Sequence, residues 1–124
     1  MSHTPPFRIL IGERDTFMQH MLAHSLGKHF QVSFVEDGLS LLRQTREILP
    51  DLVIMEGLLS SLDGYTVCQK LKNDAATAHI PVLFHTLLAD ESRARQAGAD
   101  GFLLKPVLPQ EIETKVEELL NVES

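Results

Sequence analysis

The stretch Pro50-Asp51-Leu52-Val53-Ile54-Met55-Glu56 decides the fold of this 124-residue chain. Its four central residues are all apolar, with no polar residue between them. Such a run is typical of a strand that is buried on both faces of a parallel sheet. A carboxylate, Glu56, follows the run directly. The sequence therefore predicts a central parallel strand with an acidic side chain at its carboxyl end.

Two other short apolar runs also end close to a charged residue. Residues 9–11 precede Glu13, and residues 102–104 precede Lys105. The carboxyl ends of parallel strands lie along the same edge of a sheet, where ligand and functional sites of open α/β folds are found. We therefore expect Glu13, Glu56 and Lys105 to meet in one crevice.

Between the apolar runs the sequence has helical periodicity, which predicts alternating strands and helices around a parallel sheet. We expect strands at 7–11, 31–35, 52–55, 82–85 and 101–104, and helices at 15–26, 38–49, 63–71, 90–97 and 109–120. The second strand is the least apolar, so we expect it near an edge. The length predicts one domain over residues 1–124, with residues 1–6 as a flexible tail.

Composition excludes several classes of function. The formal net charge of -6, without a cluster of Lys or Arg, argues against binding to nucleic acid or to an anionic membrane. No stretch approaches the roughly 20 apolar residues of a membrane span. The single cysteine, Cys68, has no partner for an internal disulfide, and the first residues do not form a secretory signal. We expect a cytoplasmic protein.

The chain resembles the receiver domain of bacterial two-component response regulators over nearly its whole length. The motifs that carry the resemblance are Arg8-Ile-Leu-Ile11, Pro50-Asp-Leu-Val-Ile-Met-Glu56, Leu62-Asp-Gly64, Ile80-Pro-Val-Leu-Phe-His-Thr86 and Gly98-Ala-Asp-Gly-Phe-Leu-Leu-Lys-Pro106. The resemblance implies a flavodoxin-like, doubly wound fold with strand order 2-1-3-4-5 and five helices.

The resemblance also implies roles for particular side chains. In the family an aspartate after the third strand accepts a phosphoryl group, and two acidic residues after the first strand help to bind Mg²⁺. The matching positions here are Glu56 for the acceptor and Glu13 with Arg14 for the acidic pair. The switch residues fall on Thr86 and Phe102, and the phosphate-contacting lysine falls on Lys105.

Glu56 and Arg14 depart from the family pattern. Glutamate is longer than aspartate by one carbon–carbon bond, about 1.5 Å, and a misplacement of about 1 Å costs on the order of a hundredfold in rate. Arg14 places a cation where the family has an anion, which opposes binding of Mg²⁺. We therefore expect no cofactor, with Mg²⁺ as the alternative. Our hypothesis is that Glu56 pairs instead with Lys105 or Arg14. The alternative is that Arg14 turns toward solvent and Glu56 is only a tolerated substitution.

The output side also departs from the family. Thr86 and Lys105 are 19 positions apart, about one helical turn less than in typical receivers, so the fourth helix is expected to be short. Leu87 and Leu88 follow Thr86, where the family has a small residue. They are expected either to form a docking patch or to cover the core beneath the short helix.

Some other polar residues have less specific patterns. His20 and His24 have the spacing of a metal pair but no third ligand, so we expect solvated residues of a helix. His85 is expected near the crevice and Cys68 in the core.

Two functions remain open. The preferred one is a receiver-like signalling domain, not an enzyme, that works without phosphorylation. It would bind a histidine kinase or a downstream effector through the face of the fourth helix, fifth strand and fifth helix, as a monomer or weak dimer. The alternative is a receiver that still accepts phosphate on Glu56 or another carboxylate, with Mg²⁺.

Overall fold

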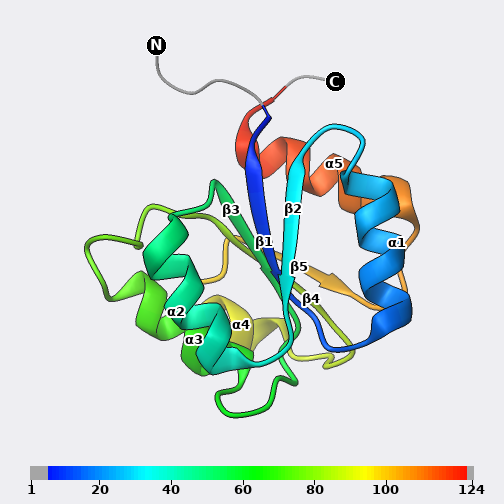
Figure 1. The fold of residues 1–124 in the computed structure, drawn as a ribbon. Coiled ribbons are helices and arrows are strands. Elements are labelled where there is room, and N and C mark those ends of the chain that lie inside the picture. Colours follow the sequence, from blue (N-terminus) through cyan, green and yellow to red (C-terminus); the bar gives the residue numbers. More distant parts are fainter. Residues whose placement is uncertain (1–5, 123–124) are drawn as a thin grey trace.

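A parallel sheet of five strands lies at the centre of the structure (Figure 1). The structure is a computed structural model that describes residues 6–122. The strand order is β2-β1-β3-β4-β5. The strands are β1 (Arg8–Gly12), β2 (Gln31–Val35), β3 (Leu52–Met55), β4 (Val82–Thr86) and β5 (Gly101–Leu104). The helices are α1 (Thr16–Leu26), α2 (Gly38–Ile48), α3 (Gly64–Lys72), α4 (Glu91–Gln96) and α5 (Pro109–Leu120). The predicted order of strands and the five helices are thus confirmed.

The strand boundaries agree with the sequence prediction to within one residue. β1 begins and ends one residue later than expected, and β4 continues by one residue to Thr86. The weakly apolar β2 lies at an edge of the sheet, as predicted. Of the flexible tail expected at residues 1–6, only Pro6 lies within the described residues.

The helices cover both faces of the sheet. α1 and α5 pack together on one face, and α2, α3 and α4 cover the other (Figure 1). Successive residues of β3 point to opposite faces, so Leu52 and Ile54 belong to the α1–α5 core and Val53 and Met55 to the α2–α3 core. All four are fully buried, which explains why the run has no polar residue.

Aspartate side chains begin four of the five helices. Asp15, Asp37, Asp63 and Asp90 each accept a hydrogen bond from a backbone N–H of the first helical turn. Such caps satisfy N–H groups that have no partner inside the helix. The fifth helix begins with Pro109 at its first position, as predicted. α4, with six residues, is the shortest of the five, in agreement with the shortening expected from the sequence. None of the helices in residues 6–122 is long and apolar enough to cross a membrane.

Gly64 lets α3 begin directly against the end of β3. Its N–H donates to the carbonyl oxygen of Gly57 at 2.9 Å. A Cβ atom added at Gly64 would lie only 2.6 Å from the backbone oxygen of Glu56. Because backbone cannot move aside as a flexible side chain can, glycine at this position keeps the loop after β3, and with it Glu56, in place.

We predict that Gly64→Ala destabilises the protein by about 1–3 kcal/mol, the usual cost of overpacking. Urea denaturation measures the free energy of unfolding. The matched control is Gly101→Ala, where the nearest atoms are side-chain atoms of Leu83, at 3.0 Å, and Leu119. The control variant is expected to lose less stability than Gly64→Ala. An equal loss of stability in both variants would argue against backbone crowding at Gly64.

Candidate functional site

A small crevice opens at the carboxyl edge of the sheet, where the loops after β1, β3, β4 and β5 come together. Its volume is about 210 Å³. The residues that line it are Glu13, Arg14, Asp15, Glu56, Leu58, Leu87 and Lys105. The three charged residues that the sequence places after β1, β3 and β5 are therefore neighbours.

The Lys105 ammonium lies between two carboxylates. Its Nζ donates to Oε1 of Glu13 at 2.7 Å and to Oε1 of Glu56 at 2.9 Å. The three side chains are between 2% and 5% exposed. The predicted convergence of these charges is confirmed, and so is the ion pair between Glu56 and Lys105. The pairs are buried, however, so a surface value of 0 to 1 kcal/mol does not apply to them.

The Glu56 carboxylate has protein donors on both oxygens. Besides Lys105, Oε1 accepts the N–H of Leu87 at 3.3 Å. Oε2 accepts the N–H of Leu58 at 3.1 Å and the hydroxyl of Thr86. The crevice therefore holds this carboxylate with four hydrogen bonds from its own chain. The Leu58 and Leu87 amides were not identified from the sequence, because backbone donors leave no residue-type signal.

These contacts set the protonation of the two central groups. Burial alone raises the pKa of Glu56, but the hydrogen bonds from Thr86, Lys105 and Leu58 outweigh it, so the pKa lies below its usual value. Burial alone lowers the pKa of Lys105, but its bonds to Glu13 and Glu56 outweigh burial and raise it. Both groups are therefore charged at neutral pH.

Arg14 lies at the mouth of the crevice and is exposed. Within residues 6–122 its guanidinium has no carboxylate oxygen within 4.0 Å. The proposed alternative pair between Glu56 and Arg14 is therefore wrong: the lysine holds Glu56, and the arginine side chain is turned toward solvent. Long charged side chains commonly extend outward in this way.

Thr86 is fully buried beside Glu56. Its hydroxyl donates to Glu56 and accepts the N–H groups of Gly57 at 3.3 Å and Leu88 at 3.1 Å. Phe102, on the neighbouring β5, is half-buried and packs on the α3–α4 side of the core. The two predicted switch positions thus lie on adjacent strands, with the threonine bonded inside the crevice.

Leu87 and Leu88 have different environments. Leu88 is half-buried against the core, whereas Leu87 is 65% exposed. The pair was expected either to cover the core or to form a docking patch. Leu88 covers the core, and only Leu87 is exposed enough to contact a partner.

Comparison with known proteins identifies the family. A family model described as the response regulator receiver domain matches residues 9–117. The chain belongs to the response regulator receiver family. It is 31% identical over 102 residues to the response regulator PleD of Caulobacter vibrioides, a match over 80% of this chain and 22% of PleD. It is 34% identical over 118 residues to the DNA-binding dual master transcriptional regulator RpaA of Synechocystis, over 92% of this chain and 49% of RpaA.

Solved receiver structures agree with this assignment. The signal receiver domain of a signal transduction histidine kinase from Syntrophus aciditrophicus superposes with a TM-score of 0.87 at 32% identity, over 93% of this chain and 90% of that one. The flavodoxin-like receiver fold predicted from the sequence is therefore confirmed. The chain spans between about a fifth and a half of the length of the two curated relatives.

His85 is a further titratable residue next to the receiver crevice. It is 2% exposed, and neither ring nitrogen has a hydrogen-bond partner within the described residues. Burial, helped by the positive charge of Lys105, lowers the pKa of His85 to about 4. The position near the crevice was predicted from the sequence, but the depth of burial was not, because a histidine after apolar residues also fits an exposed strand end.

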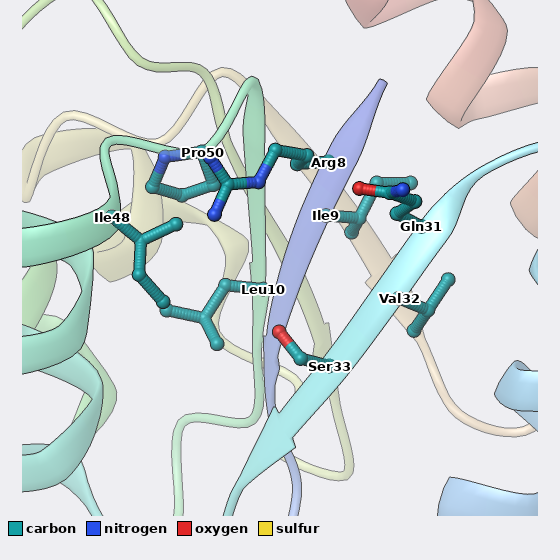
Figure 2. Close-up of a pocket in the computed structure, with 8 residues that line it drawn as sticks. All are labelled: Arg8, Ile9, Leu10, Gln31, Val32, Ser33, Ile48 and Pro50. Atoms are coloured by element: carbon teal, nitrogen blue, oxygen red, sulfur yellow. The ribbon is translucent and has the colours of Figure 1, made fainter. Parts of the chain in front are cut away.

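No group of three or more His, Cys, Asp and Glu side chains in residues 6–122 is arranged to hold a metal ion. His20 and His24 are both exposed on α1. A hollow of about 350 Å³ lies at the opposite edge of this receiver, where β1 and β2 begin (Figure 2). Its lining is mixed, with the apolar Leu10 and Ile48 beside the polar Gln31 and Ser33, and brings no cluster of reactive groups together. The crevice remains the candidate site.

We predict that Lys105→Met destabilises the protein by about 3–5 kcal/mol, because it leaves Glu13 and Glu56 buried without their cation. Urea denaturation at neutral pH is the measurement. The matched control is Lys115→Met, whose lysine pairs with Glu118 at 3.2 Å on the surface of α5. The control is expected to change stability by less than about 1 kcal/mol. Similar losses in both variants would contradict a special role for the buried ammonium.

We also predict that His85 makes the fold sensitive to mild acid. The unfolded histidine takes up a proton near its ordinary pKa of about 6.5, whereas the folded one does so near about 4. Between these values the unfolded state binds more protons, so the free energy of unfolding falls as the pH falls. From pH 7 to pH 5 this amounts to about 2 kcal/mol.

Urea denaturation of His85→Leu and wild type at pH 8, 7 and 5 measures this contribution. The variant is expected to lose about 2 kcal/mol less than wild type between pH 7 and 5. Between pH 8 and 7, where His85 is neutral in the folded state and mostly neutral in the unfolded one, the two proteins should change nearly equally. Parallel curves down to pH 5 would show that the buried imidazole does not resist protonation.

Proposed function

We propose that this receiver domain acts in two-component signalling by protein–protein interaction and without being phosphorylated. The proposal is based on one feature: both oxygens of the Glu56 carboxylate are already hydrogen-bonded within the domain. The carboxylate is buried, and its two oxygens accept four hydrogen bonds from the chain itself. A signalling role of this kind needs no catalytic step.

Acceptance of a phosphoryl group needs a carboxylate oxygen that is free and in line with the donor phosphorus. Attack by Glu56 would require its oxygen to leave Lys105, Thr86 or a backbone N–H. The longer side chain also brings the carboxylate to the Thr86 hydroxyl, about 1.5 Å beyond the reach of an aspartate. The observed contacts therefore oppose in-line transfer and hold the switch threonine at the same time.

The residues of the crevice do not fit Mg²⁺. This ion prefers near-octahedral oxygen ligands, supplied in part by clustered carboxylates. Here the Lys105 ammonium already lies between Glu13 and Glu56, and Arg14 replaces the second acidic residue. The Lys105 ammonium thus already lies between the two carboxylates that would bind the ion, and we propose that the domain works without a cofactor.

The partner is proposed to be a histidine kinase or a downstream effector that binds the face of α4, β5 and α5. This face carries the half-buried Phe102 and the 43% exposed Leu104, next to the short α4. The acidic surface, with a net charge of -6, favours a protein partner over nucleic acid or membrane. We propose a cytoplasmic domain that is a monomer or a weak dimer.

The alternative function is a working phosphoacceptor that uses Glu56 or another carboxylate with Mg²⁺. The carboxyl group has the right chemistry, and Glu13 and Lys105 match the family positions. The two functions predict opposite outcomes with a phosphoryl donor.

Incubation with acetyl phosphate and Mg²⁺, followed by intact mass spectrometry, distinguishes them. We expect the wild-type mass to stay unchanged. The positive control is the double variant Glu56→Asp with Arg14→Asp, which restores the family residues at both positions and is expected to gain one phosphoryl group. A phosphoryl group on wild-type Glu56 would overturn the proposal.

A further inference from the structure

The exposed apolar side chains of this domain gather at one edge of the sheet. In residues 6–122 the large exposed hydrophobic residues are Phe17, Leu39, Leu49, Leu58, Leu87, Leu104 and Leu108. Five of the seven follow the carboxyl end of a strand and Leu104 is the last residue of β5, whereas Leu49 lies at the end of α2, at the opposite edge. Single exposed leucines are common, but a gathering at one edge indicates an interaction surface.

Four of these residues form what we call the apolar rim: Phe17, Leu58, Leu87 and Leu108. They follow β1, β3, β4 and β5 respectively and are between 48% and 74% exposed. Leu58 and Leu87 line the crevice directly. Two of the four rim residues thus border an opening of about 210 Å³, which is large enough for one side chain but not for a folded element.

The charge inside the crevice is unbalanced. Three of the residues that line the crevice are acidic, Glu13, Asp15 and Glu56, and two are basic, Arg14 and Lys105. Lys105 pairs with Glu13 and Glu56, whereas Arg14 has no carboxylate oxygen within 4.0 Å in the described residues. A cationic side chain that enters the crevice would therefore find one uncompensated negative charge behind an apolar entrance.

We propose that the apolar rim and the crevice bind a protein segment that presents an arginine or lysine between apolar residues. This rests on the proposed function, since it requires that the crevice is not used for phosphoryl transfer. The apolar residues of the segment would contact the rim, and its cation would enter the crevice toward Glu13. Apolar burial supplies affinity here and the charge supplies selectivity. A second copy of the chain is a poorer occupant, because two chains of charge -6 repel each other.

A pair of short peptides tests the proposal directly. The first is the capped peptide of sequence alanine-leucine-arginine-leucine-alanine, and the second has neutral citrulline in place of arginine. Both are titrated into isotope-labelled wild-type protein at low salt, and the backbone amide signals are followed by NMR. We expect the arginine peptide to shift the amides of Leu58 and Leu87, and to bind at least tenfold more tightly than the citrulline peptide.

Matched leucine variants then test the surface. Leu58 and Leu49 are both 48% exposed, but they lie at opposite edges of the sheet. We expect Leu58→Ser and Leu87→Ser each to weaken binding of the arginine peptide at least fivefold. Leu49→Ser should leave it unchanged within twofold.

Several outcomes would overturn this inference. Equal affinity for the two peptides would show that charge does not contribute to binding. Amide shifts confined to residues away from the crevice would show that the apolar rim is not the binding surface. Shifts of the rim amides that depend on protein concentration without peptide would identify a second copy as the occupant. An unmodified mass after acetyl phosphate together with no peptide binding would defeat only this inference, whereas phosphorylation of Glu56 would defeat the proposed function itself.

Discussion

The structure of the site depends on one ammonium group shared by two carboxylates. Lys105 follows β5, Glu13 follows β1 and Glu56 follows β3, so its two bonds tie together the ends of three strands. Burying three charges is costly unless each is paired and hydrogen-bonded. That requirement fixes the three loops relative to one another, and the contacts of Glu56 with Thr86 and with two backbone amides extend the network to the end of β4.

The fold was predictable because its signals are local and repeated. Apolar runs mark the strands, capping aspartates mark the helix starts, and the parallel arrangement brings the strand ends together whatever their side chains are. The meeting of Glu13, Glu56 and Lys105 followed from this topology alone. The boundaries of β1 and β4 differed by one residue, because hydrogen bonding to neighbouring strands decides where a strand ends.

The details of the site were less predictable. The sequence left Lys105 and Arg14 as equal partners of Glu56, and it offered no rule for choosing, since both are long cations near the same edge. The structure distinguishes them by burial: the lysine lies inside with both carboxylates, and the arginine is exposed. The backbone donors from Leu58 and Leu87 and the unpartnered ring of His85 depend on loop conformation, which residue types alone do not encode.

The hydroxyl of Thr86 bonded to Glu56 has a consequence for how such a domain carries information. An ordinary relay protein reports an event by changing its shape, and its amount in the cell matters less. Under the proposed function this chain has a single shape, because the group that would be moved by modification is already held by a neighbouring side chain. The strength of the signal would then depend on the amount of the protein, and regulation would act on the rates at which the protein is made and degraded.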